Sequence, residues 1–155
     1  MSRLNRAVSC VVALACLTGT PAFANMGESG ASSTEANFVA GRQAIEKQDW
    51  EGALNALRKA VAADPGNADA HNWLGFAYRK LGKFAESFSA YDEALRINPQ
   101  HKAAHEYIGE AYLQTDQLDK AETHLAELNR LCTPIPCEEY KDLKRAINEY
   151  KKAHR

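Results

Sequence analysis

An internal repeat with a period of about 34 residues constrains the fold more than any other feature. Gly41, Gly75 and Gly109 mark the period, and the same residue classes recur at fixed distances after each glycine. These classes are an aromatic or small residue (Ala44, Tyr78, Tyr112), a small residue (Ala53, Ser87, Ala121) and a larger apolar residue (Leu57, Tyr91, Leu125). Such a period is typical of stacked helix–turn–helix units, which form a solenoid with an extended surface instead of a catalytic cleft.

Residues 1–24 have the three parts of a secretory signal peptide. Arg3 and Arg6 form a basic start, and an apolar run of roughly eleven residues follows. Ala22-Phe23-Ala24 provides small residues around a cleavage point after Ala24. The apolar run is too short to span a bilayer, which needs about 20 residues. The sequence therefore predicts an exported, periplasmic protein that meets the membrane only transiently through its signal.

Two other interpretations of this segment remain open. A buried N-terminal helix is possible, but Gly19, Thr20 and Pro21 would break it. Cys16 follows Ala13-Leu14-Ala15 and faintly matches a lipidation site, although a larger aliphatic residue is usual in place of Ala13.

Two of the four cysteines, Cys10 and Cys16, lie in the predicted signal, which leaves Cys132 and Cys137 in the mature chain. An even pair in an oxidising compartment predicts one disulfide. The alternative is an envelope metal- or thiol-handling protein that uses these cysteines with His124. Four residues separate the cysteines, whereas redox pairs normally have two, so the structural disulfide is favoured.

About 130 residues remain after cleavage, enough for one domain. Loss of the signal lowers the number of basic residues from 19 to 17 against 20 acidic ones, a net charge of about −3. This balance predicts no nucleic-acid partner and no strong attraction to anionic lipid. His101 and His105 have helix-face spacing, but no acidic residue completes a metal motif. No nucleophile elbow, phosphate loop or paired-carboxylate motif predicts an enzyme or a cofactor.

We expect a flexible leader at 25–34, repeats at about 35–67, 68–101 and 102–134, and a capping helix at about 138–153. Pro65 and Pro99 close the first two units. The predicted helices within the repeats are Glu35–Gln48, Trp50–Ala63, Asp69–Leu81, Phe84–Ile97, Ala103–Thr115 and Leu118–Leu131. Small residues that face each other, such as Gly75 and Ser87, would let the two helices of a unit approach closely. The capping helix would be the first helix of a fourth unit, and it would cover the last apolar face.

The motifs Leu74-Gly75-x-x-Tyr78 and Ser87-x-x-x-Tyr91-x-x-Ala94, with Pro99 after them, resemble the tetratricopeptide repeat. The third unit is similar, whereas the first has Ala44 in place of the aromatic residue. The resemblance implies an all-α, right-handed α-solenoid of three helical pairs and a cap. The pattern around Cys132 and Cys137 is similar to that of small exported bacterial members, which implies a periplasmic location and a short disulfide.

The family usually binds peptides in a concave groove lined by the first helix of each unit. The resemblance implies that the groove residues are Phe38, Arg42, Ile45, Asn72, Trp73, Phe76, Arg79, Lys80, Glu106, Tyr107, Glu110 and Leu113. Members that hold a C-terminal carboxylate use Lys, Asn and Arg at these positions. Phe38, Trp73, Ala103 and Tyr107 occupy most of those positions here, so such recognition is not predicted.

We therefore expect a non-catalytic interaction module that anchors a protein or peptide on aromatic side chains, with Arg42, Arg79, Lys80, Glu106 and Glu110 setting its polarity. Trp73 and Phe76 could instead belong to the core between neighbouring helices. Self-association through the first repeat is a third possibility, because this unit matches the family pattern least well.

Overall fold

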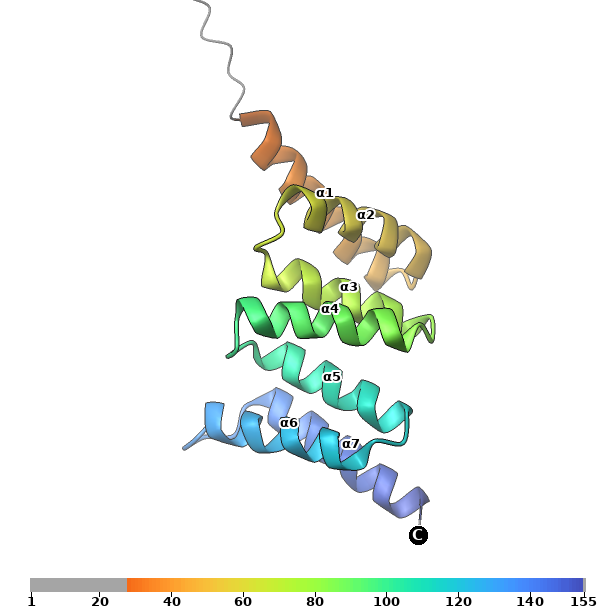
Figure 1. The fold of residues 1–155 in the computed structure, drawn as a ribbon, viewed down its shortest axis with the longest axis vertical. Coiled ribbons are helices and arrows are strands. Elements are labelled where there is room, and N and C mark those ends of the chain that lie inside the picture. The colour runs from red at the N-terminus through yellow and green to blue at the C-terminus, as the bar shows by residue number, and fades with distance from the viewer. Residues whose placement is uncertain (1–27, 155) are drawn as a thin grey trace, which may run out of the picture.

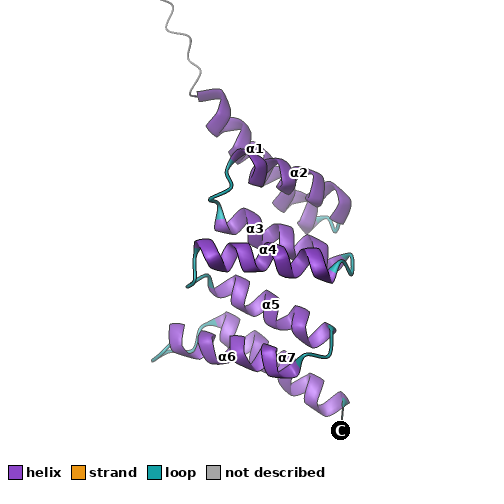
Figure 2. Ribbon diagram, viewed as in Figure 1, coloured by secondary structure: helices purple, strands orange, loops and turns teal. Residues whose placement is uncertain are grey.

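The computed structural model describes residues 28–154, which fold into seven α-helices with no strand among them (Figure 2). The helices are α1 (Glu28–Glu46), α2 (Trp50–Ala63), α3 (Ala68–Lys80), α4 (Phe84–Ile97), α5 (Lys102–Gln114), α6 (Leu118–Leu131) and α7 (Glu138–Ala153). The predicted all-α solenoid is confirmed. The predicted export signal, Cys16 and residues 25–27 lie outside the described residues.

The helical pairs follow one another along the long axis of the molecule in the order of the sequence, and α7 overlaps α6 at the far end (Figure 1). Three antiparallel pairs, α1 with α2, α3 with α4 and α5 with α6, form the three repeats, and α7 packs on both α5 and α6. Within residues 28–154, no helix is both long and apolar enough to cross a membrane.

Capping side chains and prolines set the helix ends. Asp49 accepts a hydrogen bond from the Gly52 backbone N–H at 2.9 Å, and Asn67 accepts one from Ala70 at 2.9 Å. These bonds satisfy N–H groups that have no partner inside the first turn of a helix. His101 has the same role at α5, where its Nδ1 accepts from Ala104 at 3.2 Å.

The turn inside each repeat places one residue in the left-handed backbone region. Gln48, Gly82 and Asp116 occupy this position, with φ of 59°, 70° and 57°. Glycine adopts this conformation without steric cost, whereas Gln48 and Asp116 hold it at a cost of about 1 kcal/mol each. The turn geometry is therefore common to the three repeats although the residue is not.

Helix α1 corrects the sequence prediction, because it begins at Glu28 and not near Glu35. Residues 28–34 were expected to be flexible leader, and that prediction is wrong for this segment. Ser29-Gly30 is a turn signal near the start of this segment, but no proline or glycine lies between it and Gly41. Extending a formed helix fixes only one residue for each new hydrogen bond, so the packed turns of α1 propagate towards the N-terminus.

Glycine positions decide how closely the helices approach. A Cβ atom built on Gly41 would lie 2.5 Å from the Leu57 side chain, and one on Gly75 would lie 2.7 Å from the Tyr91 ring. Ser87 reinforces the second pair by donating a hydrogen bond to the Gly75 carbonyl at 2.8 Å. The predicted close approach within these two repeats is thus seen.

The third repeat departs from this pattern. A Cβ atom on Gly109 would lie 2.6 Å from Leu143 of α7, so the glycine receives a residue of the capping helix and not Leu125 of its own unit. Leu143 is fully buried, together with Leu128 and Ile147. The capping helix therefore completes the last core, as the sequence predicts, and it does so through the face of α5.

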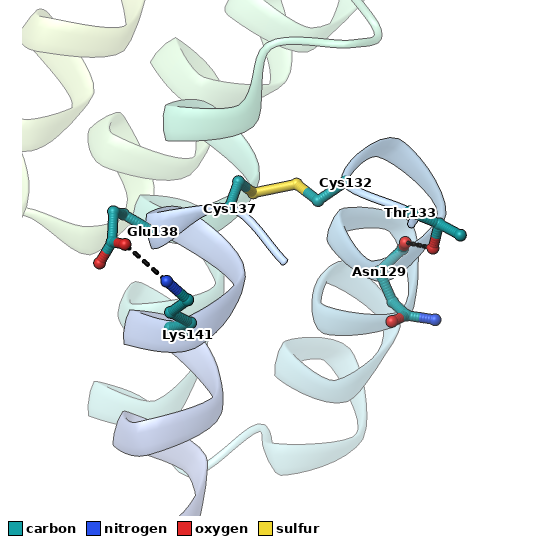
Figure 3. The surroundings of a disulfide bond; sticks show 6 residues. All are labelled: Asn129, Cys132, Thr133, Cys137, Glu138 and Lys141. Carbon is teal, nitrogen blue, oxygen red and sulfur yellow. Dashed lines mark hydrogen bonds and ion pairs between the residues drawn. A yellow bond between two sulfur atoms is a disulfide. The ribbon is translucent and has the colours of Figure 1, made fainter. Parts of the chain in front are cut away.

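A disulfide joins the end of α6 to the beginning of α7 (Figure 3). The Cys132 and Cys137 sulfurs are 2.00 Å apart and their Cα atoms are 5.4 Å apart. Thr133 donates a hydrogen bond to the Asn129 carbonyl at 2.6 Å, and Lys141 pairs with Glu138 at 2.7 Å. The predicted bridge thus fixes the connection on which the position of α7 depends.

Candidate functional site

Four aromatic side chains from α2, α3 and α5 form a cluster on the surface made by the first helices of the repeats. Phe76 is central, with its ring centroid 5.7 Å from Trp73, 5.1 Å from Tyr107 and 6.2 Å from Trp50. Trp73 and Tyr107 are 6.1 Å apart. The rings are tilted or edge-to-face, which is the arrangement that aromatic quadrupoles favour. We call Trp50, Trp73, Phe76 and Tyr107 the aromatic cluster.

All four rings of the aromatic cluster are half-buried. Trp73 also packs against the core formed by α2 and α3. The sequence leaves open whether Trp73 and Phe76 line the groove or belong to the core. In the structure both rings are packed against other side chains and still expose part of their area. A half-buried aromatic surface of this kind suits the capture of an apolar side chain.

Two exposed cations border the aromatic cluster. The Arg42 guanidinium lies 5.5 Å from the Trp73 ring centroid, and the Lys80 ammonium lies 5.2 Å from that of Phe76. Both side chains lie over aromatic faces, where the negative face of the ring attracts a cation. They give this part of the surface a positive charge without being used in an ion pair among the described residues.

Two polar residues predicted for the groove have buried side chains. Asn72 is 1% exposed, and Arg79 is 5% exposed. Arg79 pairs with Glu110 at 2.7 Å and lies over the rings of Phe76 and Tyr107. The prediction that Arg79 faces a partner is therefore wrong, because its side chain is buried and paired within the chain. Glu110 keeps 28% of its side chain exposed, so its role in partner polarity stays a prediction. The ion pair joins α3 to α5 beneath the aromatic cluster.

Glu106 lies at the α7 end of this surface in an acidic setting. Burial raises the pKa of its carboxyl to about 8, with further increases from Glu110, Asp142 and Glu139 and opposition from Arg79. Burial and Glu106 also raise the pKa of Tyr107. The raised pKa favours the protonated form of the Glu106 carboxyl, which can donate a hydrogen bond.

A pocket of about 420 Å³ adjoins the Arg79–Glu110 ion pair, where α3, α5 and α7 meet. Lys80, Glu110, Gln114, Ala146, Glu149 and Tyr150 are among its lining residues. Helix α7 therefore bounds the surface at one end. This role is not among the sequence predictions, although the repeat register places α7 where the first helix of a fourth unit would stand.

The remaining predicted groove residues do not join the aromatic cluster. Phe38 is half-buried against the core of the first two repeats, as is Ile45, and Leu113 is buried against α7 residues. Trp50 takes the place expected of Phe38, and sequence reasoning missed it. A signal was present, because Trp50, Phe84 and Leu118 are the first residues of the three second helices.

The histidines make structural hydrogen bonds. His71 Nε2 lies 3.1 Å from the Pro65 carbonyl oxygen, and His105 Nε2 lies 3.0 Å from that of Pro99. His101 Nε2 bonds to Asp69 at 3.0 Å, which links the second and third repeats. Because His71 and His105 hold the same repeat position, each fixes the proline turn that precedes its helix.

The described residues contain no group of three or more His, Cys, Asp and Glu that could hold a metal ion. Cys132 and Cys137 are joined to each other, so neither sulfur is a thiolate. His124 bonds to His105, with 2.9 Å between their Nδ1 atoms. Among the described residues, Cys132, Cys137 and His124 thus form no group that could hold a metal ion.

Comparison with known proteins places these observations in a family. Two tetratricopeptide repeat models match residues 38–102 and 78–131, which together make up more than half of the chain. The chain belongs to the tetratricopeptide repeat family. The anaphase-promoting complex subunit 3 of Schizosaccharomyces pombe is 28% identical over 110 residues, which cover 65% of this chain and 16% of that protein. The chain spans 16% or less of the curated relatives it matches.

Solved structures of other proteins show the same fold. The first repeat domain of Spaghetti (RPAP3), bound to an HSP90 peptide, has a TM-score of 0.69 and 20% identity, and the match covers 79% of this chain and 94% of that one. PcrH in complex with the chaperone binding region of PopD has a TM-score of 0.71 and 16% identity, with coverage of 81% and 96%. These likenesses establish the shared architecture.

Proposed function

We propose that this chain is a non-catalytic interaction module that holds a segment of a partner protein against the aromatic cluster. The observation that carries the proposal is a half-buried group of four rings, supplied by three helices and bordered by exposed cations. Rings fixed in this way lose little conformational entropy when a partner packs on them. Structural neighbours in complex with peptides or with a partner region support the assignment to this class.

The charges around the aromatic cluster favour a partner segment of defined polarity. Arg42 and Lys80 would attract an acidic residue, while an apolar side chain of the segment packs on Trp73 and Phe76. At the α7 end, the protonated Glu106 would donate a hydrogen bond to a carbonyl of the segment. The segment would therefore lie along the surface in one direction.

The same proposal places the protein in the periplasm after cleavage behind Ala24. The basic, apolar and small-residue parts of residues 1–24 support export, and the Cys132–Cys137 disulfide suits an oxidising compartment. N-terminal sequencing of the protein from a periplasmic fraction should begin at Asn25. A protein recovered with residue 1 still attached would contradict export with cleavage. A protein acylated at Cys16 would contradict cleavage after Ala24.

An affinity capture from periplasmic extract, analysed by mass spectrometry, tests the function. The wild type should retain a partner that the Trp73→Ala, Phe76→Ala double variant loses. Phe88→Ala is the matched control, because Phe88 is also half-buried and aromatic but stacks on Tyr112 at 4.6 Å, outside the aromatic cluster. This control should retain the partner.

The charge contribution has a separate test that leaves the core intact. Arg42→Glu with Lys80→Glu should weaken the purified complex by about ten-fold or more, and the affinity of the wild type should fall with added salt.

If the Trp73→Ala, Phe76→Ala double variant binds like the wild type while its circular dichroism is unchanged, the aromatic cluster is not the binding surface.

A further inference from the structure

The second repeat carries a separate furrow, away from the aromatic cluster. It has a volume of about 650 Å³, and its lining includes His71, Leu74, Tyr78, Glu86, Ala90 and Glu93. His71, Leu74 and Tyr78 share one face of α3, roughly opposite to Trp73 and Phe76 by helical geometry. The furrow is therefore distinct from the surface of the proposed function.

In the third repeat, a histidine side chain fills the equivalent place. His105 and Tyr112 stand one repeat after His71 and Tyr78, and His124 stands one repeat after Ala90. The His124 ring stacks on Tyr112, with centroids 5.7 Å apart and planes 20° apart. Its Nδ1 lies 2.9 Å from Nδ1 of His105. The furrow exists in the second repeat because alanine replaces this ring.

The hydrogen-bond pattern shows what His71 would accept. A carbonyl oxygen only accepts, so His105 donates from Nε2 to Pro99, and its Nδ1 is then the acceptor for His124. His71 makes the same bond from Nε2 to the Pro65 carbonyl. Its Nδ1 is therefore also an acceptor, and no described residue donates a hydrogen bond to it.

The acidic side chains at the edge of the furrow favour an incoming ring that is protonated and positively charged. Glu86 stands where Lys120 stands in the third repeat, and Glu93 corresponds to Glu127. Glu93 pairs with Arg96 at 2.6 Å on its outer side. From α2, Arg58 donates hydrogen bonds to the Tyr78 hydroxyl at 3.0 and 2.7 Å and so fixes the ring that lines the furrow.

We propose that this furrow binds a histidine side chain of a partner protein. The incoming ring would donate an N–H to His71 Nδ1, stack on Tyr78 and lie beside Glu86 and Glu93. It would thus repeat the contacts that His124 makes within the chain. The volume exceeds that of one imidazole ring, so residues flanking the histidine would also enter.

Nuclear magnetic resonance of the ¹⁵N-labelled protein tests the proposal with acetyl-Ala-His-Ala-amide as the probe. The amide signals of Leu74 and Ala90 should shift in a saturable way, with a dissociation constant of about 1 mM, as expected for so small a ligand. Ala90→His places a ring in the furrow from within the chain and should abolish the response. Ala126→His, at an exposed alanine of α6, should leave it unchanged.

Several outcomes would overturn the proposal. One is the absence of saturable shifts in the wild type, and another is an equal response to acetyl-Ala-Arg-Ala-amide, which would indicate a general cation site. Should Ala90→His fail to fold, His71→Leu provides the second test, because it removes the acceptor and keeps an apolar side chain. An unchanged response in that variant contradicts the role given to His71.

Discussion

Gly75 shows how one residue position sets the distance between two helices. Its missing side chain leaves space for the Tyr91 ring, which is fully buried. Burial also raises the pKa of the Tyr91 hydroxyl well above its usual range, against the opposing effect of the nearby Arg79 guanidinium. A glycine in a helix costs about 1 kcal/mol relative to alanine. Here that cost is offset by the packing of a large aromatic side chain.

Gly75→Leu should lower the free energy of unfolding by about 3 kcal/mol, because even its Cβ would lie 2.7 Å from the Tyr91 ring. Urea denaturation followed by circular dichroism measures the change. Gly66→Ala is the control, since a Cβ atom on Gly66 would lie 3.4 Å from Asp64 Oδ1, an ordinary contact at an exposed turn. A Gly75→Leu protein as stable as the control would show that the two helices can separate at little cost.

Glu106 predicts a stability that decreases at alkaline pH. Its pKa is about 8 in the folded chain and about 4.5 in the unfolded one. Between these values the unfolded chain releases a proton that the folded chain keeps, so the free energy of unfolding falls as pH rises from 4.5 to 8. Glu106→Gln should therefore be more stable than the wild type at pH 8.5, by roughly 1–2 kcal/mol after allowance for solvent screening.

The same comparison at pH 4 should show little difference, because the wild-type carboxyl is then protonated in both states. Glu35→Gln, at an exposed position of α1, should match the wild type at both pH values. If Glu106→Gln is less stable than the wild type at pH 8.5, the carboxylate is stabilised by its surroundings and the raised pKa is wrong.

Residue positions on the first helices could be predicted from the period, but their exposure could not. Asn72 and Arg79 lie at the repeat positions predicted for the groove, yet both are buried. Trp50 was missed for the opposite reason, because it lies on a second helix, outside the positions predicted for the groove, and still packs near Phe76. Periodicity identifies a face of a helix, whereas exposure depends on which side chains from other helices cover that face.

At the scale of helices, the turn and helix-breaking residues in the sequence determined which helix boundaries could be predicted. The predicted bounds of α2, α4 and α6 agree with the structure, because turn residues lie on both sides of each helix. The predicted bounds of α3 and α5 differ from the structure by one residue at each end. Only the beginning of α1 is far from its predicted position, because the breaking residue Gly30 lies inside the helix and does not end it. Helix ends with a physical stop signal are thus readable from one sequence.

The hydrogen bond between α5 and α6 predicts sensitivity to acid. Burial and His105 lower the pKa of His124 to about 4 from an ordinary value of 6.5, while Glu127 opposes the shift. Between pH 6.5 and 4 the unfolded chain binds a proton that the folded chain excludes. Stability should therefore fall as pH decreases through this window, and His124→Phe should make that fall shallower.

His124→Phe keeps a ring to stack on Tyr112 but leaves Nδ1 of His105 without its donor. We expect it to be less stable than the wild type at pH 7.5 by about 1–2 kcal/mol. Thermal unfolding over pH 4–7.5 measures both effects. His154→Phe, at the exposed end of α7, should retain the wild-type slope. An unchanged slope in His124→Phe would mean that the histidine pair does not exclude protons.

For the whole molecule, the Cys132–Cys137 bridge controls how firmly α7 closes the solenoid. A bridge over so short a loop stabilises by about 2 kcal/mol on the loop-entropy estimate. Reduction should lower the free energy of unfolding by that amount, as measured by urea denaturation with and without a phosphine reductant. The Cys132→Ala, Cys137→Ala variant should have the stability of the reduced protein and not respond to the reductant. A reductant effect in that variant would exclude the bridge as its cause.

Leu143 stands one repeat after Gly109, at the position where the three repeats have glycine. In the first two repeats that glycine receives a large side chain from the next helix, whereas Leu143 is itself inserted against Gly109. A helix that packed on α7 as α2 packs on α1 would clash with the Leu143 side chain, because the repeats have glycine at this position. The solenoid could therefore be lengthened by duplication of an internal repeat, but not by a helix packed in this way on α7.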